Sequence, residues 1–210
     1  MLDFTTDRGY GCPPPATHQV AIDLALSPSI GDGACPHLAV LLRTDSELFP
    51  VLASFYALGA KRRGFLVHRS IQGERSHDRE ALVAAGLDVA GLEASQQFEI
   101  VEFDPDEPAD SSPQPWQHVL DRSLSSGYAA LWYSRFAVGP GDAEYNNLLP
   151  FERAWGQCFA NQPVVTLCPY IVGALDGAQV LERMGDVAQS HEGILLAGDN
   201  GLTLLRPTVT

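Results

Sequence analysis

Short apolar segments alternate with stretches of helical periodicity along most of the chain. Five compact apolar runs are predicted strands, at residues 37–42, 64–68, 97–103, 129–133 and 164–170. Because these runs are almost continuously apolar, they are typical of strands that are covered on both faces. Two further runs, 193–197 and 202–205, flank an Asn-Gly pair that favours a tight turn, and they predict a final hairpin.

The segments between the strands carry apolar residues at helical spacing. Helices are predicted at 45–58, 77–86, 116–126, 147–159 and 177–190. The clearest is 147–159, where Leu148, Phe151, Trp155 and Phe159 share one face. Strands that alternate with helices predict an α/β domain of three layers, with a mostly parallel sheet and helices on both faces.

The two ends of the chain differ in pattern. Residues 1–34 contain a Cys-Pro-Pro-Pro run and scattered glycines, and we interpret them as a partly extended N-terminal arm. Within this arm, 20–26 is a candidate edge strand. Residues 35–210 are interpreted as one domain, with surface loops at the proline-rich, acidic segment 104–115 and at the glycine-rich segment 136–145.

Composition narrows the function classes. The chain is 45% hydrophobic, which is enough for a core, and it has 13 basic against 26 acidic residues, a net charge of −13. That balance argues against direct nucleic-acid binding. No apolar run is long enough to span a membrane and no apolar signal segment opens the sequence, so we expect a cytoplasmic protein whose four cysteines are thiols.

The turn after the first predicted strand carries no phosphate-binding motif. It reads Arg43-Thr44-Asp45-Ser46, without the glycines and lysine of a nucleotide-binding loop. We expect Thr44 or Asp45 to cap the following helix, with Glu47 nearby, while Arg43 or Thr44 could alternatively contact a small ligand. Nucleotide hydrolysis is therefore not expected, and no cofactor is implied.

Cys168 is the candidate reactive side chain, because it lies near the carboxyl end of the fifth predicted strand. It could be a core thiol, a ligand-contacting or redox-sensing thiol, or a nucleophile with His191 as its base. A metal set could be assembled from Cys35, His37, Cys168 and His191. Such loose spacing is weak support, so no metal site is expected.

A buried ion pair is also predicted. Arg135 follows the fourth strand, and Glu152 lies at the edge of the apolar stripe of the next helix, so the two could pair. The alternative is an exposed Glu152 beside Arg153. The histidines at positions 18, 68, 77 and 118 show no partner pattern and are expected in surface or loop positions.

The ordered series of motifs resembles the MEDS domain family, the methanogen/methylotroph, DcmR sensory domain. The matching features include HLAVLLRT from His37, LVAAGLDV at 82–89, the strand that ends in Arg135, Phe151-Glu152, Cys168-Pro-Tyr170 and His191. Together they span about residues 36–198. The resemblance implies a RecA/KaiC-like fold without a phosphate loop, and ligand-contacting roles for a set of residues: His37, Arg135, Glu152, Cys168, Tyr170 and His191.

The resemblance implies a non-catalytic sensory or regulatory domain in bacterial signal transduction or transcription control. Its partner would be a small organic molecule or a signalling protein such as a histidine kinase or a sigma-factor regulator. Since the domain occupies nearly all 210 residues, the signal would pass through another polypeptide. Two alternatives stay open: an enzyme that depends on Cys168 or on a metal, and a pure protein-interaction module.

Overall fold

The protein is built around one seven-stranded sheet with the strand order β3-β2-β4-β5-β1-β6-β7. The computed structural model describes residues 15–26, 36–103, 113–139 and 143–206. All neighbouring strands run parallel except β6 and β7, which form the predicted antiparallel hairpin. The strands are β1 (His37–Leu42), β2 (Gly64–Ile71), β3 (Phe98–Phe103), β4 (Ala130–Arg135), β5 (Val164–Ile171), β6 (Gly193–Gly198) and β7 (Gly201–Leu205).

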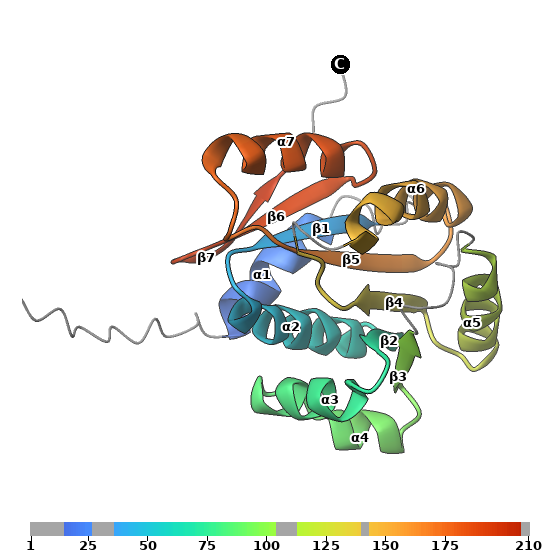
Figure 1. Ribbon diagram of the computed structural model, residues 1–210. Coiled ribbons are helices and arrows are strands. Elements are labelled where there is room, and N and C mark those ends of the chain that lie inside the picture. Colours follow the sequence, from blue (N-terminus) through green and yellow to red (C-terminus); the bar gives the residue numbers. More distant parts are fainter. Residues whose placement is uncertain (1–14, 27–35, 104–112, 140–142, 207–210) are drawn as a thin grey trace, which may run out of the picture.

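Helices cover both faces of the sheet, as Figure 1 shows, so the predicted three-layer α/β architecture is confirmed. On one face α1, α2, α3 and α4 enclose the largest core cluster. On the other face lie α5, α6 and α7. The helices are α1 (Pro15–Leu26), α2 (Leu48–Lys61), α3 (Arg75–Ala84), α4 (Val89–Ala94), α5 (Gln114–Ser125), α6 (Ala143–Cys158) and α7 (Gly177–Ala188), with a short 3₁₀ turn η1 at Asp45–Glu47.

The edge strand predicted at 20–26 is wrong, because these residues belong to α1. His18, Ile22, Ala25 and Leu26 are buried at helical spacing, and the helix packs on α2 and β7. The glycine-rich loop predicted at 136–145 is shorter than expected, since α6 begins at Ala143. Residues 1–14, 27–35 and 104–112, which hold most of the arm, Cys35 and most of the acidic loop, lie outside the described residues.

His18 and His68 are buried rather than surface residues, which corrects the sequence expectation; His77 and His118 are exposed. His68 on β2 faces Asp78 of α3, with its Nε2 3.1 Å from Asp78 Oδ2. Its Nδ1 lies 3.2 Å from the Tyr56 hydroxyl, and the Ser70 hydroxyl donates to the same carboxylate oxygen. These bonds tie α2 and α3 to the sheet on the face opposite α6.

Asp78 is expected to make stability depend on pH. Burial alone would raise the pKa of Asp78, but its hydrogen bonds to His68 and Ser70 outweigh burial and lower it. A carboxyl whose folded pKa is depressed stabilises the fold above its unfolded pKa and loses that contribution as pH falls. Asp78→Asn should therefore cost about 2 kcal/mol of unfolding free energy in neutral urea titrations, and less in acid. An equal cost at both pH values would contradict this account.

The turn after β1 is occupied by a carboxylate rather than by a phosphate-binding loop. The Arg43 backbone N–H donates to Glu47 Oε2 at 2.7 Å, and its guanidinium donates to Oε1. The predicted capping by Thr44 or Asp45 is wrong, since the N-cap residues of η1 and α2 are Thr44 and Glu47 and neither makes a side-chain cap bond. The amide that could face an anion is thus already satisfied within the chain.

Parallel α/β sheets commonly bind ligands in a crevice outside the carboxyl ends of two strands, where the strand order reverses. It would lie at the carboxyl ends of β1 and β5, whose following connections run in opposite directions across the sheet. At this point Val172 donates its backbone N–H to the Leu42 carbonyl, and a Cβ on Gly173 would overlap the Arg43 carbonyl oxygen. The ends of β1 and β5 thus stay in contact for at least one residue beyond the sheet.

Candidate functional site

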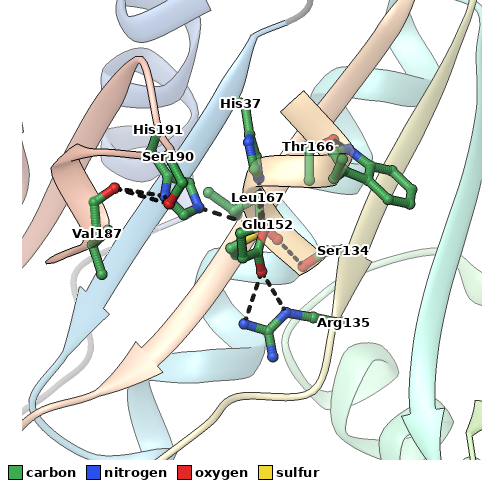
Figure 2. Close-up of polar contacts among 11 residues, drawn as sticks. His37, Ser134, Arg135, Glu152, Thr166, Leu167, Val187, Ser190 and His191 are labelled. Atoms are coloured by element: carbon green, nitrogen blue, oxygen red, sulfur yellow. Dashed lines mark hydrogen bonds and ion pairs between the residues drawn. The ribbon is translucent and has the colours of Figure 1, made fainter. Parts of the chain in front are cut away.

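Six of the seven candidate residues meet on the sheet face that α6 and α7 cover: His37, Arg135, Glu152, Cys168, Tyr170 and His191. Figure 2 shows His37 and His191 converging on Glu152, with Arg135 on its other side. None of the six is more than 5% exposed. We call His37, Arg135, Glu152, Cys168 and His191 the buried cluster. The seventh candidate, Arg43, lies outside it, exposed and paired with Glu47 and Asp199.

The order of the strands creates this cluster. β1 lies between β5 and β6, so His37 opens a central strand and stands opposite Thr166. Cys168 follows two residues later on β5 and therefore points to the same face. The sequence pattern had predicted Cys168 near the end of its strand. Instead, β5 continues to Ile171, so Cys168 lies within the sheet.

The apolar side chains of α6 pack on the sheet and thereby place Glu152 in the same layer. Phe151, Trp155 and Phe159 are buried, as the periodicity predicted, and the Trp155 indole N–H donates to Thr166 Oγ1 at 2.9 Å. Glu152 follows Phe151 and is itself 1% exposed, so the exposed alternative is wrong. The predicted pair with Arg135 is confirmed.

Glu152 is the hub of the buried cluster. Its Oε2 accepts a hydrogen bond from His37 Nε2 at 2.8 Å and one from the Cys168 thiol at 3.2 Å, and it lies 3.8 Å from His191 Nε2. Its Oε1 faces Arg135, at 3.2 Å from Nε and 3.1 Å from Nη2. His37 Nε2 is also 3.3 Å from Cys168 Sγ, which closes a compact polar group.

His191 is held with its Nε2 directed at this hub. Its Nδ1 lies 2.9 Å from the Val187 carbonyl oxygen at the end of α7 and 3.1 Å from the Ser190 hydroxyl. Because a carbonyl oxygen only accepts, Nδ1 carries the ring proton and Nε2 presents a lone pair. Its ring centroid is 4.1 Å from that of His37, so the two imidazoles are in contact.

The charges of the cluster follow from burial and from these neighbours. Burial by itself would raise the pKa of Glu152, but the Arg135 guanidinium and the His37 hydrogen bond outweigh it and hold that pKa far below its usual value. Burial, followed by the proximity of His37, lowers the pKa of His191 to about 3. At neutral pH Glu152 is thus a carboxylate beside the Arg135 guanidinium, and His191 is neutral.

Cys168 lacks the surroundings of a nucleophile. Burial, then the adjacent Glu152 carboxylate, raises the pKa of the Cys168 thiol well above its usual value. Catalytic cysteines are partly exposed and electropositive, with a depressed pKa. The same two causes raise the pKa of Tyr170, which lies beside Arg135 and His191. The geometry therefore counts against the enzyme alternative that relies on thiolate attack.

A surface groove borders the buried cluster at His191. It runs between the ends of α6 and α7 and is lined by polar and small residues, among them Arg153, Gly156, Gln157, Ser190, His191 and Glu192. At Gly156 the groove comes close to His37, because a Cβ added to this glycine would lie 3.7 Å from His37 Nδ1. Neither Gly156 nor Ser190 stands out in the sequence, where the only signal is that Ser190 directly precedes His191.

Four side chains of the buried cluster could together hold a metal ion. One ligand atom from each of His37, Glu152, Cys168 and His191 lies within 4.8 Å of all the others. Sequence spacing alone had given no reason to group Glu152 with the other three.

The comparison with family models matches the MEDS family, described as the methanogen/methylotroph, DcmR sensory domain, over residues 36–192. The chain belongs to this family. The match begins directly before His37 and ends directly after His191, so all residues of the buried cluster lie inside the MEDS domain. Its description makes this a sensory domain. The comparison with curated proteins finds no match. In the part of the chain that the structure describes, no helix has the length and apolar character needed to cross a membrane.

Proposed function

We propose that this MEDS domain is a non-catalytic sensor that binds a small polar organic molecule in the groove between α6 and α7. The observation that carries the proposal is the continuity of this groove with the buried cluster through His191 and Gly156. A ligand in the groove would touch the same layer that holds Glu152 and Arg135. We further propose that the domain acts in the cytoplasm and passes its signal to a partner of the histidine-kinase or sigma-regulator kind.

The buried cluster is better suited to a ligand-dependent conformational change than to stabilising the fold. A buried ion pair is a costly way to stabilise a fold, because desolvation offsets most of the attraction between its charges. Its carboxylate is carried by α6, which contains Pro150 and therefore lacks one internal hydrogen bond. A ligand that moves the end of α6 against α7 would shift Glu152 relative to the strands, and this would couple the groove to the sheet.

A thermal-shift screen with small organic acids, alcohols and amines tests the proposal. A ligand at a hundredfold excess over its Kd should stabilise the domain by about 2.7 kcal/mol, or a Tm increase of roughly 5–10 °C for a domain of this size. Gly156→Leu, which places a large side chain between the groove and His37, should abolish the increase. Gly185→Leu is the matched control, because Gly185 is an exposed helical glycine with open space around it.

Two outcomes would contradict the proposal. One is a Tm that no small molecule raises but a partner protein does, which would favour the interaction module. The other is a ligand-induced increase of equal size in wild type and Gly156→Leu, which would place the ligand elsewhere. Circular dichroism of both variants shows whether they retain the wild-type fold.

A further inference from the structure

Four donor groups in the buried cluster have the composition of a zinc site. Two imidazoles, one thiol and one carboxylate come from four separate segments: the start of β1, the turn between α7 and β6, the middle of β5 and helix α6. Nitrogen and sulfur donors with one carboxylate suit Zn²⁺ better than the all-oxygen sets that Mg²⁺ and Ca²⁺ prefer. These four donors meet in a buried layer, which their spacing along the sequence does not indicate.

The spacing of the donor atoms fits one ion at their centre. Ligands of tetrahedral Zn²⁺ stand about 2.0–2.3 Å from the metal and hence about 3.3–3.8 Å from one another. Glu152 Oε2 lies 2.8 Å from His37 Nε2, 3.2 Å from Cys168 Sγ and 3.8 Å from His191 Nε2. All four atoms lie within 4.8 Å of one another, so movements of up to about 1 Å would bring them to coordination distances.

The surrounding groups orient the donors as in metal sites. The Val187 carbonyl fixes the His191 proton on Nδ1, so Nε2 offers its lone pair inward, and Arg135 holds the second oxygen of Glu152. Among the described residues, His191 Nε2 has no hydrogen-bond partner although it is buried. A buried polar atom without a partner costs free energy, and a metal ion would satisfy it.

We infer that the buried cluster binds one Zn²⁺ ion through His37 Nε2, Glu152 Oε2, Cys168 Sγ and His191 Nε2. Binding converts the Cys168 thiol into a zinc-bound thiolate and releases its proton to solvent. The His37 proton moves from Nε2 to Nδ1, which is buried behind Gly156 and beside the groove. The two anionic ligands then balance the charge of the ion, while Arg135 remains on Glu152 Oε1.

This inference deepens the proposed function and rests on it only for the role of the metal. Four protein ligands close a tetrahedral site, and closed zinc sites are structural, whereas catalytic ones keep a position open for water. The metal would therefore stabilise the buried cluster and fix its geometry. A ligand in the groove would act on the buried cluster without becoming a substrate.

The test is the metal content of the full chain after incubation with Zn²⁺ and gel filtration. Wild type should retain about one zinc per chain and release about one proton per zinc in a weakly buffered titration. Co²⁺ in its place should give thiolate-to-cobalt charge transfer and the intense visible bands of tetrahedral cobalt. Cys168→Ser and His191→Gln should each weaken zinc binding by at least 100-fold, and Cys168→Ser should abolish the charge-transfer band.

Cys158→Ser is the matched control, because Cys158 lies on α6, is half-buried and does not belong to the four-residue set. It should retain wild-type zinc. Wild type that retains no zinc or cobalt overturns the inference, as does equal zinc loss in Cys158→Ser and Cys168→Ser. Circular dichroism separates loss of binding from loss of fold. If zinc is absent but the small-molecule shift survives, only the metal site fails; if zinc binds but no small molecule does, only the proposed sensing function fails.

Discussion

Glu152→Gln is expected to lower the free energy of unfolding by about 3–5 kcal/mol, measured by urea titration with a chelator present. The substitution removes the only charge within 4 Å, among the described residues, that balances the fully buried Arg135 guanidinium. Breaking one partner of a buried pair costs far more than the pair contributes, because the remaining charge has lost its water and its counter-ion. Glutamine keeps the size of the side chain, so the loss reports charge and not packing.

Glu93→Gln supplies the comparison, since Glu93 pairs with Arg79 at 2.8 Å where both side chains are at least one third exposed. That substitution should cost no more than about 1 kcal/mol. Replacing Arg135 and Glu152 together by methionine and leucine should recover most of the loss seen in Glu152→Gln. Equal costs for Glu152→Gln and Glu93→Gln would show that the buried pair does not exist as described.

Gly173→Ala is expected to destabilise the protein by about 3 kcal/mol. The added Cβ would overlap the carbonyl oxygen of Arg43, and backbone cannot move aside as a flexible side chain can. The neighbouring bond from the Val172 N–H to the Leu42 carbonyl holds the two strand ends together, so relief requires separating β1 from β5. Thermal or urea unfolding of the variant measures the effect.

Gly185→Ala is the paired substitution for this prediction. Gly185 lies in α7 with no atom within 4 Å of the added Cβ, and alanine should stabilise the helix by about 0.5–1 kcal/mol. Opposite signs for the two glycines are therefore expected. A Gly173→Ala variant as stable as wild type would mean that the ends of β1 and β5 are not in contact.

The local pattern of apolar and polar residues was sufficient to predict much of the fold and one contact of the site. The strands and the hairpin followed from short apolar runs and an Asn-Gly turn, because burial on both faces selects for such runs. The Arg135–Glu152 pair was predictable, since a strand end and the next helix are neighbours in space. The prediction of a strand at 20–26 failed because a mostly apolar run of seven residues fits a strand and a helix equally well. The packing of this segment on α2 favours the helix.

The remainder of the site depends on the order of the strands, which periodicity does not encode. His37 reaches Glu152 across 115 residues of sequence, and it does so because β1 inserts between β5 and β6. Likewise, Cys168 was placed correctly on a strand, but its burial beside a carboxylate could not be read from the chain. The resemblance to the MEDS family named these residues together, and the structure supplies the physical reason for their association.

If the groove between α6 and α7 and the buried cluster form one sensing site, a ligand in the groove must change the surroundings of His37 and His191. Nuclear magnetic resonance of the histidine side chains measures this change, with each compound that raises the Tm added to saturation. The imidazole resonances of His37 and His191 should shift, while those of His68, buried with Asp78 on the opposite face, should stay unchanged. Unchanged His37 and His191 resonances at saturation, or an equal shift of His68, would contradict the account.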